Sequence, residues 1–385
     1  MTDEKTTKWA ELIWKKSAEK ISKTADLIGV EFPDKAVGDI YCYSSNIADW
    51  ITGFWPGIMW LMYDKTGDEK YIDIAKKCEE RLDEALGVTG HINSIAHDVG
   101  FTWSLVSASS YRLTGDEKSK FRIIAAAHLL AGRFNIGGRF FRSWNDQVGV
   151  DTRGWTIADN MMNLPLLYTA SEILNDPRFS LMAQAHTETA LEKLVRPDGS
   201  VNHIIKLDIY TGEKLSDEER ADCMKFTQGA SLDSSWTRGQ AWVLYGLILG
   251  YIHTKREDFL DGAKKCAHYF MASMGDRVVP PIDFRGDEEI KGMDASAGAV
   301  AACAFIEIAN SVSQCEKKMY YDFALRLVKG LDEICADYSD KTNYLLNHAA
   351  THWGGKETRD CALIYADYFY MEALYKLCGG TTLFW

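Results

Sequence analysis

Clusters of basic residues are missing from this 385-residue sequence, and its net charge is −12 at pH 7. A protein that binds DNA or RNA needs Lys and Arg side chains that neutralise phosphates and release counterions. The charge balance therefore argues against a nucleic acid partner. It does not exclude a small anionic substrate, which requires only a local positive site.

Long apolar runs are missing as well. No stretch is long enough to cross a membrane as a helix, and the N-terminal residues Met1–Lys5 do not introduce the apolar segment of a signal peptide. The nine cysteines are scattered without a CxxC pair. This is typical of reduced thiols in a cytoplasm rather than of a disulfide framework. We therefore expect a cytoplasmic protein without a membrane span.

Motifs for metal or phosphate binding are also absent. His348 and His352 have the spacing of two metal ligands on a helix, but no HExxH pattern contains them. The GxxxxGK loop that binds phosphates does not occur. We therefore expect no metal site.

What the sequence does contain is a series of helix pairs joined by short hinges. The string Thr-Gly-Asp-Glu-Lys occurs at residues 66–70 and again at 114–118, each time between two stretches with helical periodicity. The predicted pairs are 49–64 with 69–86, 98–113 with 117–133, 159–173 with 178–195, 238–252 with 258–274, 294–310 with 317–336, and 360–378 with the N-terminal stretch 9–28.

The first helix of each pair is apolar on most faces and the second is amphipathic, which indicates a buried helix followed by a surface helix. Six inner helices surrounded by six outer helices form an all-α fold, the (α/α)6 barrel. The alternative is an open helical solenoid, whose terminal repeats are polar caps. Because the last predicted inner helix is very apolar, closure is favoured. We expect residues 1–385 to form one catalytic domain.

The segments between successive pairs are long, whereas the hinges within a pair are short. Each long segment leads into the start of an inner helix, so all of them should lie at one end of the barrel. Loops of this length in a compact domain are usually functional. The active face is therefore expected at the end that carries the N-termini of the inner helices. The long segments are 87–97, 134–158, 196–237, 275–293 and 337–359.

Asp159 lies in an apolar or neutral stretch, with no Lys or Arg within five positions. Partial burial raises the pKa of a carboxyl, which is how a general acid is obtained near neutral pH. The alternative is a helix N-cap, because Pro165 can begin a helix. Asp98 starts the neighbouring inner helix, and two carboxyls in one pocket share a proton, as in glycoside chemistry. Asp49 and Asp294 are interpreted as helix caps.

Arg238 lies in an aromatic neighbourhood between Trp236 and Trp242. Its guanidinium offers a planar fork for a substrate carboxylate, and the alternative is a structural ion pair. The same two tryptophans, together with Trp50 and Trp144, are candidates for walls that stack on sugar rings. Packing in the core is the alternative for all four.

Taken together, these motifs resemble the unsaturated glucuronyl hydrolases of glycoside hydrolase family 88. The matching pieces are Asp49-Trp50 with Gly53-Phe54-Trp55, His97 through Phe101, Asp159 with Asn163 through Leu167, and Ser234 through Trp242. They occur in the family's order between about residues 40 and 370. The resemblance implies the (α/α)6 barrel, with Asp159 as the general acid/base and Asp98 as the second essential carboxylate. It also implies a substrate pocket lined by Trp50, His97, Trp144, His203, Gln228, Ser234, Trp236, Arg238 and Trp242.

The resemblance is weaker near the late histidine, His352. An aromatic residue that precedes this histidine in some members is Thr351 here. Members that accept sulfated glycosaminoglycan fragments resemble one another in a cluster of hydroxyl groups and a Lys that follows. Thr351 and Lys356 match this cluster in part, while Gly354 stands where a Ser can occur. We include Thr351, His352 and Lys356 among the expected substrate-binding residues and leave tolerance of sulfate open.

The resemblance also implies the reaction and the partner. The substrate is a small di- or oligosaccharide with a 4,5-unsaturated uronate at its non-reducing end. Water adds across the vinyl ether, and the resulting hemiketal collapses and releases the other sugar, without a metal or an organic cofactor. Two alternatives remain: an unsaturated rhamnogalacturonyl hydrolase on the same barrel, against which the Asp98 motif argues, and a non-catalytic sugar-binding helical protein. The oligomeric state is left open.

Overall fold

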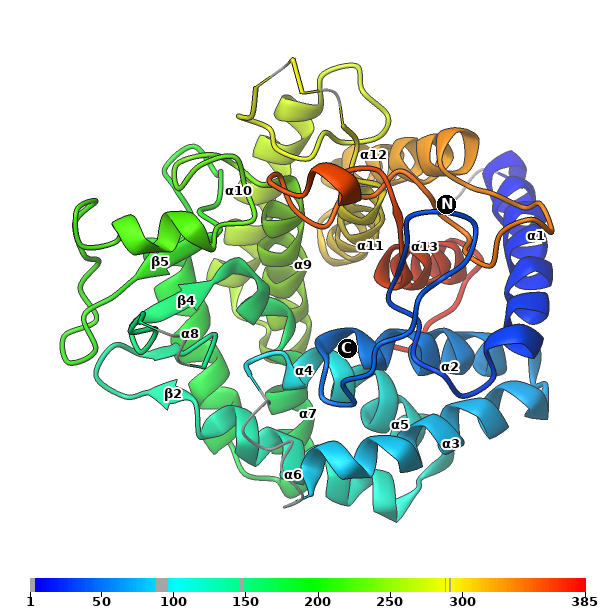
Figure 1. Ribbon diagram of the computed structural model, residues 1–385, viewed down its shortest axis with the longest axis horizontal. Coiled ribbons are helices and arrows are strands. Elements are labelled where there is room, and N and C mark those ends of the chain that lie inside the picture. The colour runs from blue at the N-terminus through cyan, green and yellow to red at the C-terminus, as the bar shows by residue number, and fades with distance from the viewer. Residues whose placement is uncertain (1–3, 88–95, 146–148, 288, 291) are drawn as a thin grey trace.

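Two concentric rings of helices surround one axis in the computed structural model (Figure 1). It describes residues 4–87, 96–145, 149–287, 289–290 and 292–385. Outside these ranges lie residues 1–3, which belong to the N-terminal stretch without an expected signal peptide. Outside them also lie residues 88–95, 146–148, 288 and 291 of the predicted long segments.

The inner ring contains the apolar helix of each predicted pair. Its members are α2 (Phe54–Thr66), α4 with α5 (Val99–Trp103 and Ser109–Thr114), α7 (Pro165–Leu174), α9 (Thr237–Thr254), α11 (Ala295–Ser311) and α13 (Ile364–Leu377). A π-helical turn, Ser104–Ala108, joins α4 to α5, so these two form a single inner helix. In α9 every residue from Thr237 to Gly250 is buried, as expected for a helix that is apolar on all sides.

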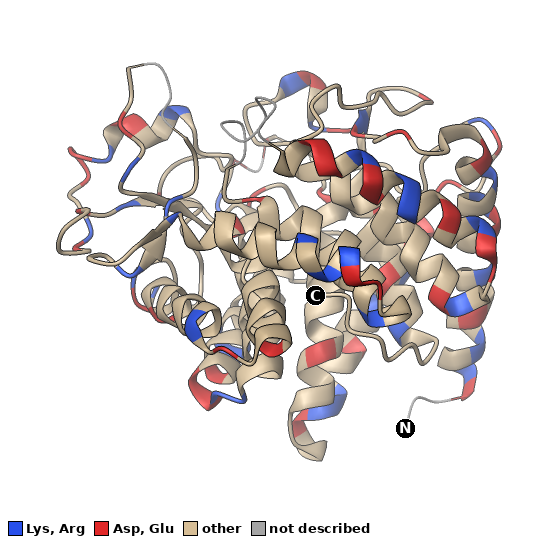
Figure 2. Cartoon of the chain, turned by 90° about the horizontal axis from the view of Figure 1, so that it is seen from below, with Lys and Arg blue, Asp and Glu red and all other residues tan. Residues whose placement is uncertain are grey.

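The outer ring contains the amphipathic partners. They are α3 (Glu69–Leu86), α6 (Glu117–Ala131), α8 (Arg178–Lys193), α10 (Glu257–Met274), α12 (Gln314–Ile334) and α1 (Glu4–Ile28). Lys, Arg, Asp and Glu residues are frequent on these helices and on the connecting segments, whereas the central helices contain few (Figure 2). Because α1 packs on α13, and α13 on both α2 and α11, the ring is closed. The predicted (α/α)6 barrel is confirmed, with six inner and six outer helices within the described ranges.

The repeated Thr-Gly-Asp-Glu-Lys string ends one helix and starts the next. Gly67 and Gly115 both adopt φ of 71° directly after an inner helix, a conformation that favours glycine. Asp68 and Asp116 then cap the outer helices by accepting hydrogen bonds from backbone N–H groups in the first turn. The hinge is short because the stop and start signals are adjacent.

Three inner helices begin later than their periodicity predicted. A 3-10 turn, Trp50–Gly53, precedes α2, and another, Ala158–Met162, precedes α7, which begins at Pro165. Proline suits the first helical position because it has no N–H to leave unpaired there. The start of α13 is Ile364 rather than residue 360, because the chain first forms strand β6 (Ala362–Leu363).

Short antiparallel strand pairs occur at the end of the barrel that carries the long segments. They are β1 (Lys35–Ala36) with β6, β2 (Phe134–Asn135) with β3 (Phe140–Phe141), and β4 (Trp155–Ile157) with β5 (Ile204–Lys206). Ile157 pairs with Ile204, and the Ala158 N–H donates to the His203 carbonyl at 2.9 Å. This pairing places Asp159 beside His203. None of the helices in the described part of the chain is both long and apolar enough to span a bilayer.

Candidate active site

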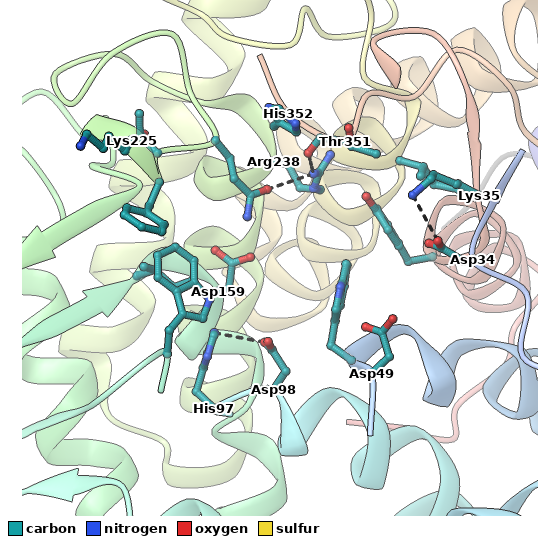
Figure 3. Close-up of a pocket in the computed structure, with 18 residues that line it drawn as sticks. Asp34, Lys35, Asp49, His97, Asp98, Asp159, Lys225, Arg238, Thr351 and His352 are labelled. Atoms are coloured by element: carbon teal, nitrogen blue, oxygen red, sulfur yellow. Dashed lines mark hydrogen bonds and ion pairs between the residues drawn. The ribbon is translucent and has the colours of Figure 1, made fainter. Parts of the chain in front are cut away.

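A cavity of about 530 Å³ opens at the end of the barrel where the inner helices begin (Figure 3). Both predicted catalytic carboxylates, Asp98 and Asp159, line it. The described residues around it are Asp34, Lys35, Asp49, Trp50, His97, Asp98, Trp144, Ile157, Asp159, Lys225, Phe226, Thr227, Gln228, Arg238, Thr351, His352, Leu363 and Tyr365. The prediction that Asp98 and Asp159 share one pocket at this end is confirmed.

Asp159 lies in the 3-10 turn before α7 and is only 9% exposed. The N-cap positions of the turn and of α7 are Ile157 and Leu164, so Asp159 is not a helix cap. Its Oδ2 atom has no hydrogen-bond partner among the described residues. Burial raises the pKa of Asp159 to about 6, while the charge of Arg238 opposes the rise. The raised pKa agrees with the expectation from the apolar sequence.

Asp98 occupies the N-cap position of α4, yet its side chain makes no capping bond within the described ranges. Its Oδ1 atom lies 3.1 Å from Nε2 of His97. Burial, followed by the charge of Asp159, raises the pKa of Asp98 to about 8. We expected Asp159 to hold the proton that the pair shares. In the structure both carboxyls have raised pKa values: the charge of Arg238 favours ionisation of Asp159, and the charge of Asp159 favours the protonated form of Asp98.

Two buried histidines lie behind the carboxylates. His97 contacts the Ser143 carbonyl through Nδ1 at 2.9 Å, and His203 accepts the backbone N–H of Gln228 through Nδ1 at 3.0 Å. His203 Nε2 lies 3.8 Å from Oδ2 of Asp159. Burial lowers the pKa of both histidines to about 3, so both rings are neutral near pH 7.

Arg238 borders the cavity from the first turn of α9, but its guanidinium is bound by the protein. Nη1 forms an ion pair with Asp294 Oδ2 at 2.8 Å, and the two terminal nitrogens donate to the carbonyls of Ala350 and Thr351. Asp294 also caps α11, as expected, by accepting from two backbone N–H groups in its first turn. The interpretation of Arg238 as a structural ion pair is therefore confirmed. Its role toward a substrate stays a prediction.

The four candidate tryptophans divide into two pairs. Trp50 and Trp144 line the cavity. Trp236 and Trp242 are at most 1% exposed and lie behind it, where Trp236 packs against the Arg238 guanidinium and Trp242 against Phe101. For Trp236 and Trp242 the alternative of core packing is confirmed.

Of the remaining expected binding residues, three line the cavity and two do not. Gln228, Thr351 and His352 line the cavity. Ser234 is buried, and its hydroxyl donates to the Ser231 carbonyl. Lys356 is an exposed residue of the 3-10 turn Lys356–Thr358 and lies outside the set of described residues that line the cavity.

Several lining residues were not predicted. Asp49 was interpreted as a cap, but within the described ranges it makes no capping bond; its Oδ2 accepts the Ser44 hydroxyl at 3.0 Å. Burial raises the pKa of Asp49. Asp34 and Lys35 reach the cavity through the pairing of β1 with β6, about 330 residues away in the sequence, so no local signal could reveal them. Asp49 could have been recognised from its place in the Asp49-Trp50 motif.

Comparison with known proteins agrees with this geometry. The profile of Glycosyl Hydrolase Family 88 matches residues 20–272. An unsaturated glucuronyl hydrolase of Bacillus sp. strain GL1 is 31% identical over 361 residues, 93% of each chain. An unsaturated chondroitin disaccharide hydrolase of Streptococcus agalactiae is 30% identical over 96% of this chain and 92% of its own length. The crystal structure of an unsaturated glucuronyl hydrolase from that species superposes with a TM-score of 0.88 at 29% identity, covering 98% of this chain and 94% of the other.

A helical barrel with two carboxylates in one cavity that also contains tryptophan rings is typical of a glycoside hydrolase, and the relatives support this class. The chain belongs to Glycosyl Hydrolase Family 88, as its motifs led us to expect.

Proposed function

We propose that this enzyme releases a 4,5-unsaturated glucuronate from the non-reducing end of oligosaccharides that a polysaccharide lyase has produced. The chain acts on unsaturated glucuronyl residues, as the resemblance of its motifs implied. The observation that carries the mechanism is the pair formed by Asp98 and Asp159, two carboxyls with raised pKa values in one cavity. Such a pair holds one proton near neutral pH, so it can supply an acid and a base together.

The proposed reaction is a hydration. A proton is transferred to C4 of the vinyl ether, positive charge develops toward C5 and the ring oxygen, and water bonds to C5. The hemiketal then opens and the other sugar leaves. Asp98 and Asp159 transfer the protons and stabilise the charge, because they are the carboxyls that approach the cavity from two adjacent inner helices.

Binding of the sugar rings is assigned to the residues on the cavity surface. Trp50 and Trp144 provide apolar faces, and sugar rings pack their C–H groups on such faces. Arg238 Nη2 donates to Gln228 Oε1 at 3.4 Å, so the amide NH₂ of Gln228, for which the described residues supply no acceptor, can donate to the substrate. Thr351 and His352 add polar groups on the same side.

The location and extent of the catalytic unit are also proposals. One continuous apolar core includes residues from Ala10 to Trp385, which supports a single catalytic domain over the chain. All nine cysteines are unpaired, which supports a reducing compartment such as the cytoplasm.

An absorbance assay tests the function. The conjugated uronate absorbs in the far ultraviolet and loses this band on hydration. We expect loss of the band with unsaturated disaccharides from chondroitin, hyaluronan or heparin, and none with Asp159→Asn. We expect sulfated disaccharides to be used more slowly, because Lys356 is exposed and is not among the described residues that line the cavity, and Gly354 offers no hydroxyl. Turnover of a rhamnogalacturonan disaccharide alone, or of none, would overturn the proposal.

A further inference from the structure

The residues that follow α13 turn back into the barrel. Gly379 adopts φ of 80°, a left-handed conformation that favours glycine, and reverses the chain directly after the helix. The Thr382 hydroxyl then donates at 3.1 Å to Asp64 in the last turn of α2. Since the inner helices end opposite the active cavity, the segment 379–385 enters the barrel from that opposite end. The C-terminal end of the chain lies inside the ring of helices (Figure 1).

Trp385 lies near the axis of the barrel and is fully buried. Its ring packs against Phe101 on α4, with ring centroids 6.0 Å apart, and against Tyr245 on α9, with centroids 6.3 Å apart. It also stacks on Phe369 of α13, in parallel planes with centroids 5.6 Å apart. The helices α4, α9 and α13 are alternate members of the inner ring. A side chain that contacts all three therefore occupies the centre of the barrel.

A hydrogen bond fixes the orientation of this ring. The Trp385 indole N–H donates to Oε2 of Glu372 at 3.0 Å. Glu372 is fully buried on α13, and its Oε1 atom accepts from the Tyr245 hydroxyl at 2.5 Å and pairs with Lys376 at 2.9 Å. A displaced indole would leave Oε2 without a donor among the described residues, which is costly for a buried carboxyl oxygen. The indole is therefore held by more than apolar contact.

Phe101 connects Trp385 to the active cavity. It lies in α4, three residues after Asp98, and its ring packs against that of Trp50 with centroids 5.5 Å apart. Trp50 in turn lines the cavity. The rings of Trp385, Phe101 and Trp50 thus form a continuous series from the barrel axis to the cavity wall. Because protein interiors are closely packed, removal of one ring leaves a void toward which its neighbours move.

We propose that Trp385 is a positioning residue, whose indole holds Phe101 and thereby keeps Asp98 and Trp50 at the places that catalysis requires. The inference rests on the proposed assignment of Asp98 to the catalytic pair. It adds a residue that lies outside the described cavity lining and outside residues 20–272, which the family profile matches. The alternative is a ring that contributes to stability alone.

Trp385→Gly removes the ring from the full chain. We expect kcat to fall by about tenfold, because misplacing a catalytic group by about 1 Å can cost up to about 10²-fold in rate. KM should change little, since Trp50 keeps its ring contacts with Phe54 and Tyr365. Trp385→Phe keeps an aromatic ring on the axis but loses the indole donor, so its kcat should lie between those of the wild type and Trp385→Gly.

Added indole tests whether the ring itself is required. The space that Trp385→Gly vacates is surrounded by aromatic rings, and engineered apolar cavities bind small aromatic molecules. A cavity of about 280 Å³ borders residues 380–383, so indole can approach from the end opposite the active site. We expect indole to restore much of the kcat of Trp385→Gly and to leave the wild-type kcat unchanged. Failure of indole to raise kcat would overturn the inference.

A matched control is Phe384→Ala. Phe384 is 1% exposed in the same segment, but its ring packs on Tyr375, with centroids 5.6 Å apart, rather than on Phe101. Both Phe384→Ala and Trp385→Gly should lower the melting temperature, and only Trp385→Gly should lower kcat. An equal loss of kcat in both, or wild-type kcat in Trp385→Gly, would leave Trp385 with a stabilising role alone. If Trp385→Gly does not fold, Trp385→Phe is compared with the control, and an unchanged kcat refutes the inference.

The coupling can also be measured without substrate by ¹⁹F NMR of protein labelled with 5-fluorotryptophan. Trp50→Phe assigns the Trp50 signal by its loss. We expect this signal to shift in Trp385→Gly, because the ring of Phe101 moves beside it, to return with indole, and to stay in place in Phe384→Ala. An unmoved Trp50 signal in Trp385→Gly overturns the inference. Because no turnover is needed, this result is independent of whether the proposed function holds.

Discussion

Replacing Arg238 by Met removes a buried cation while keeping most of the side-chain volume. The Arg238 side chain is 3% exposed, and the side chain of its partner Asp294 is fully buried. After the change, Asp294 keeps the hydrogen bonds to the first turn of α11, but its charge has no cation beside it. Breaking a buried pair from one side typically costs about 3–5 kcal/mol, because the remaining charge is left uncompensated. We expect Arg238→Met to lower the free energy of unfolding by about 3 kcal/mol, the lower end of this range, because the backbone N–H groups of α11 still stabilise the charge of Asp294.

Urea unfolding of a double-mutant cycle measures this effect. Asp294→Asn keeps the capping oxygen and removes the charge, so Arg238→Met with Asp294→Asn leaves no unpaired charge. The double variant should be more stable than the sum of the single changes predicts, by about 1–3 kcal/mol. Activity should fall in Arg238→Met, because Arg238 also binds the Thr351 carbonyl and orients the Gln228 amide. An Arg238→Met protein with unchanged stability and only a raised KM would refute the reasoning and favour a substrate clamp.

Three further results are expected. The kcat profile should be bell-shaped: it falls below pH about 6 as the pair Asp98 and Asp159 gains a second proton and above about 8 as the pair loses its last proton, by about tenfold one pH unit outside each limb; a flat profile between pH 5 and 9 would contradict it. Asp159→Asn should lower turnover by about 10²-fold or more with an unchanged melting curve and substrate binding, and near wild-type turnover would exclude Asp159 from the chemistry. Gly100→Ala should lower kcat, because its Cβ would lie 2.4 Å from the Cα of Asn163, whereas Gly132→Ala, with its nearest contact at 3.4 Å, should not; equal kcat values would contradict this.

The barrel could be predicted because its signals are local. Helical periodicity distinguishes apolar from amphipathic helices. The Thr-Gly-Asp-Glu-Lys string marks where one helix ends and the next begins, because Gly67 terminates α2 and Asp68 caps α3. Since each long segment enters an inner helix, the active end follows from the order of the elements alone. The raised pKa of Asp159 also followed from its apolar neighbours in the sequence.

The rest of the site depends on contacts between distant segments. Asp34 and Lys35 reach the cavity only through the pairing of β1 with β6. The partner of Arg238 is 56 residues away, at the start of the next inner helix. The charge that opposes the rise in the pKa of Asp159 could not be predicted either, because it comes from Arg238 on another inner helix.

The spacing of the Asp98 and Asp159 carboxyls is determined by a close contact between the start of α4 and the segment that leads into α7. Asn163 accepts the Phe101 N–H through Oδ1 at 2.9 Å and donates to the Asp159 carbonyl through Nδ2 at 3.2 Å. It thereby joins the first turn of α4, which follows Asp98, to the 3-10 turn that contains Asp159. The absence of a side chain at Gly100 allows this approach. Rigid elements hold a catalytic pair more accurately than loops do. In this barrel the accuracy comes from one glycine and one asparagine that do not belong to the described cavity lining.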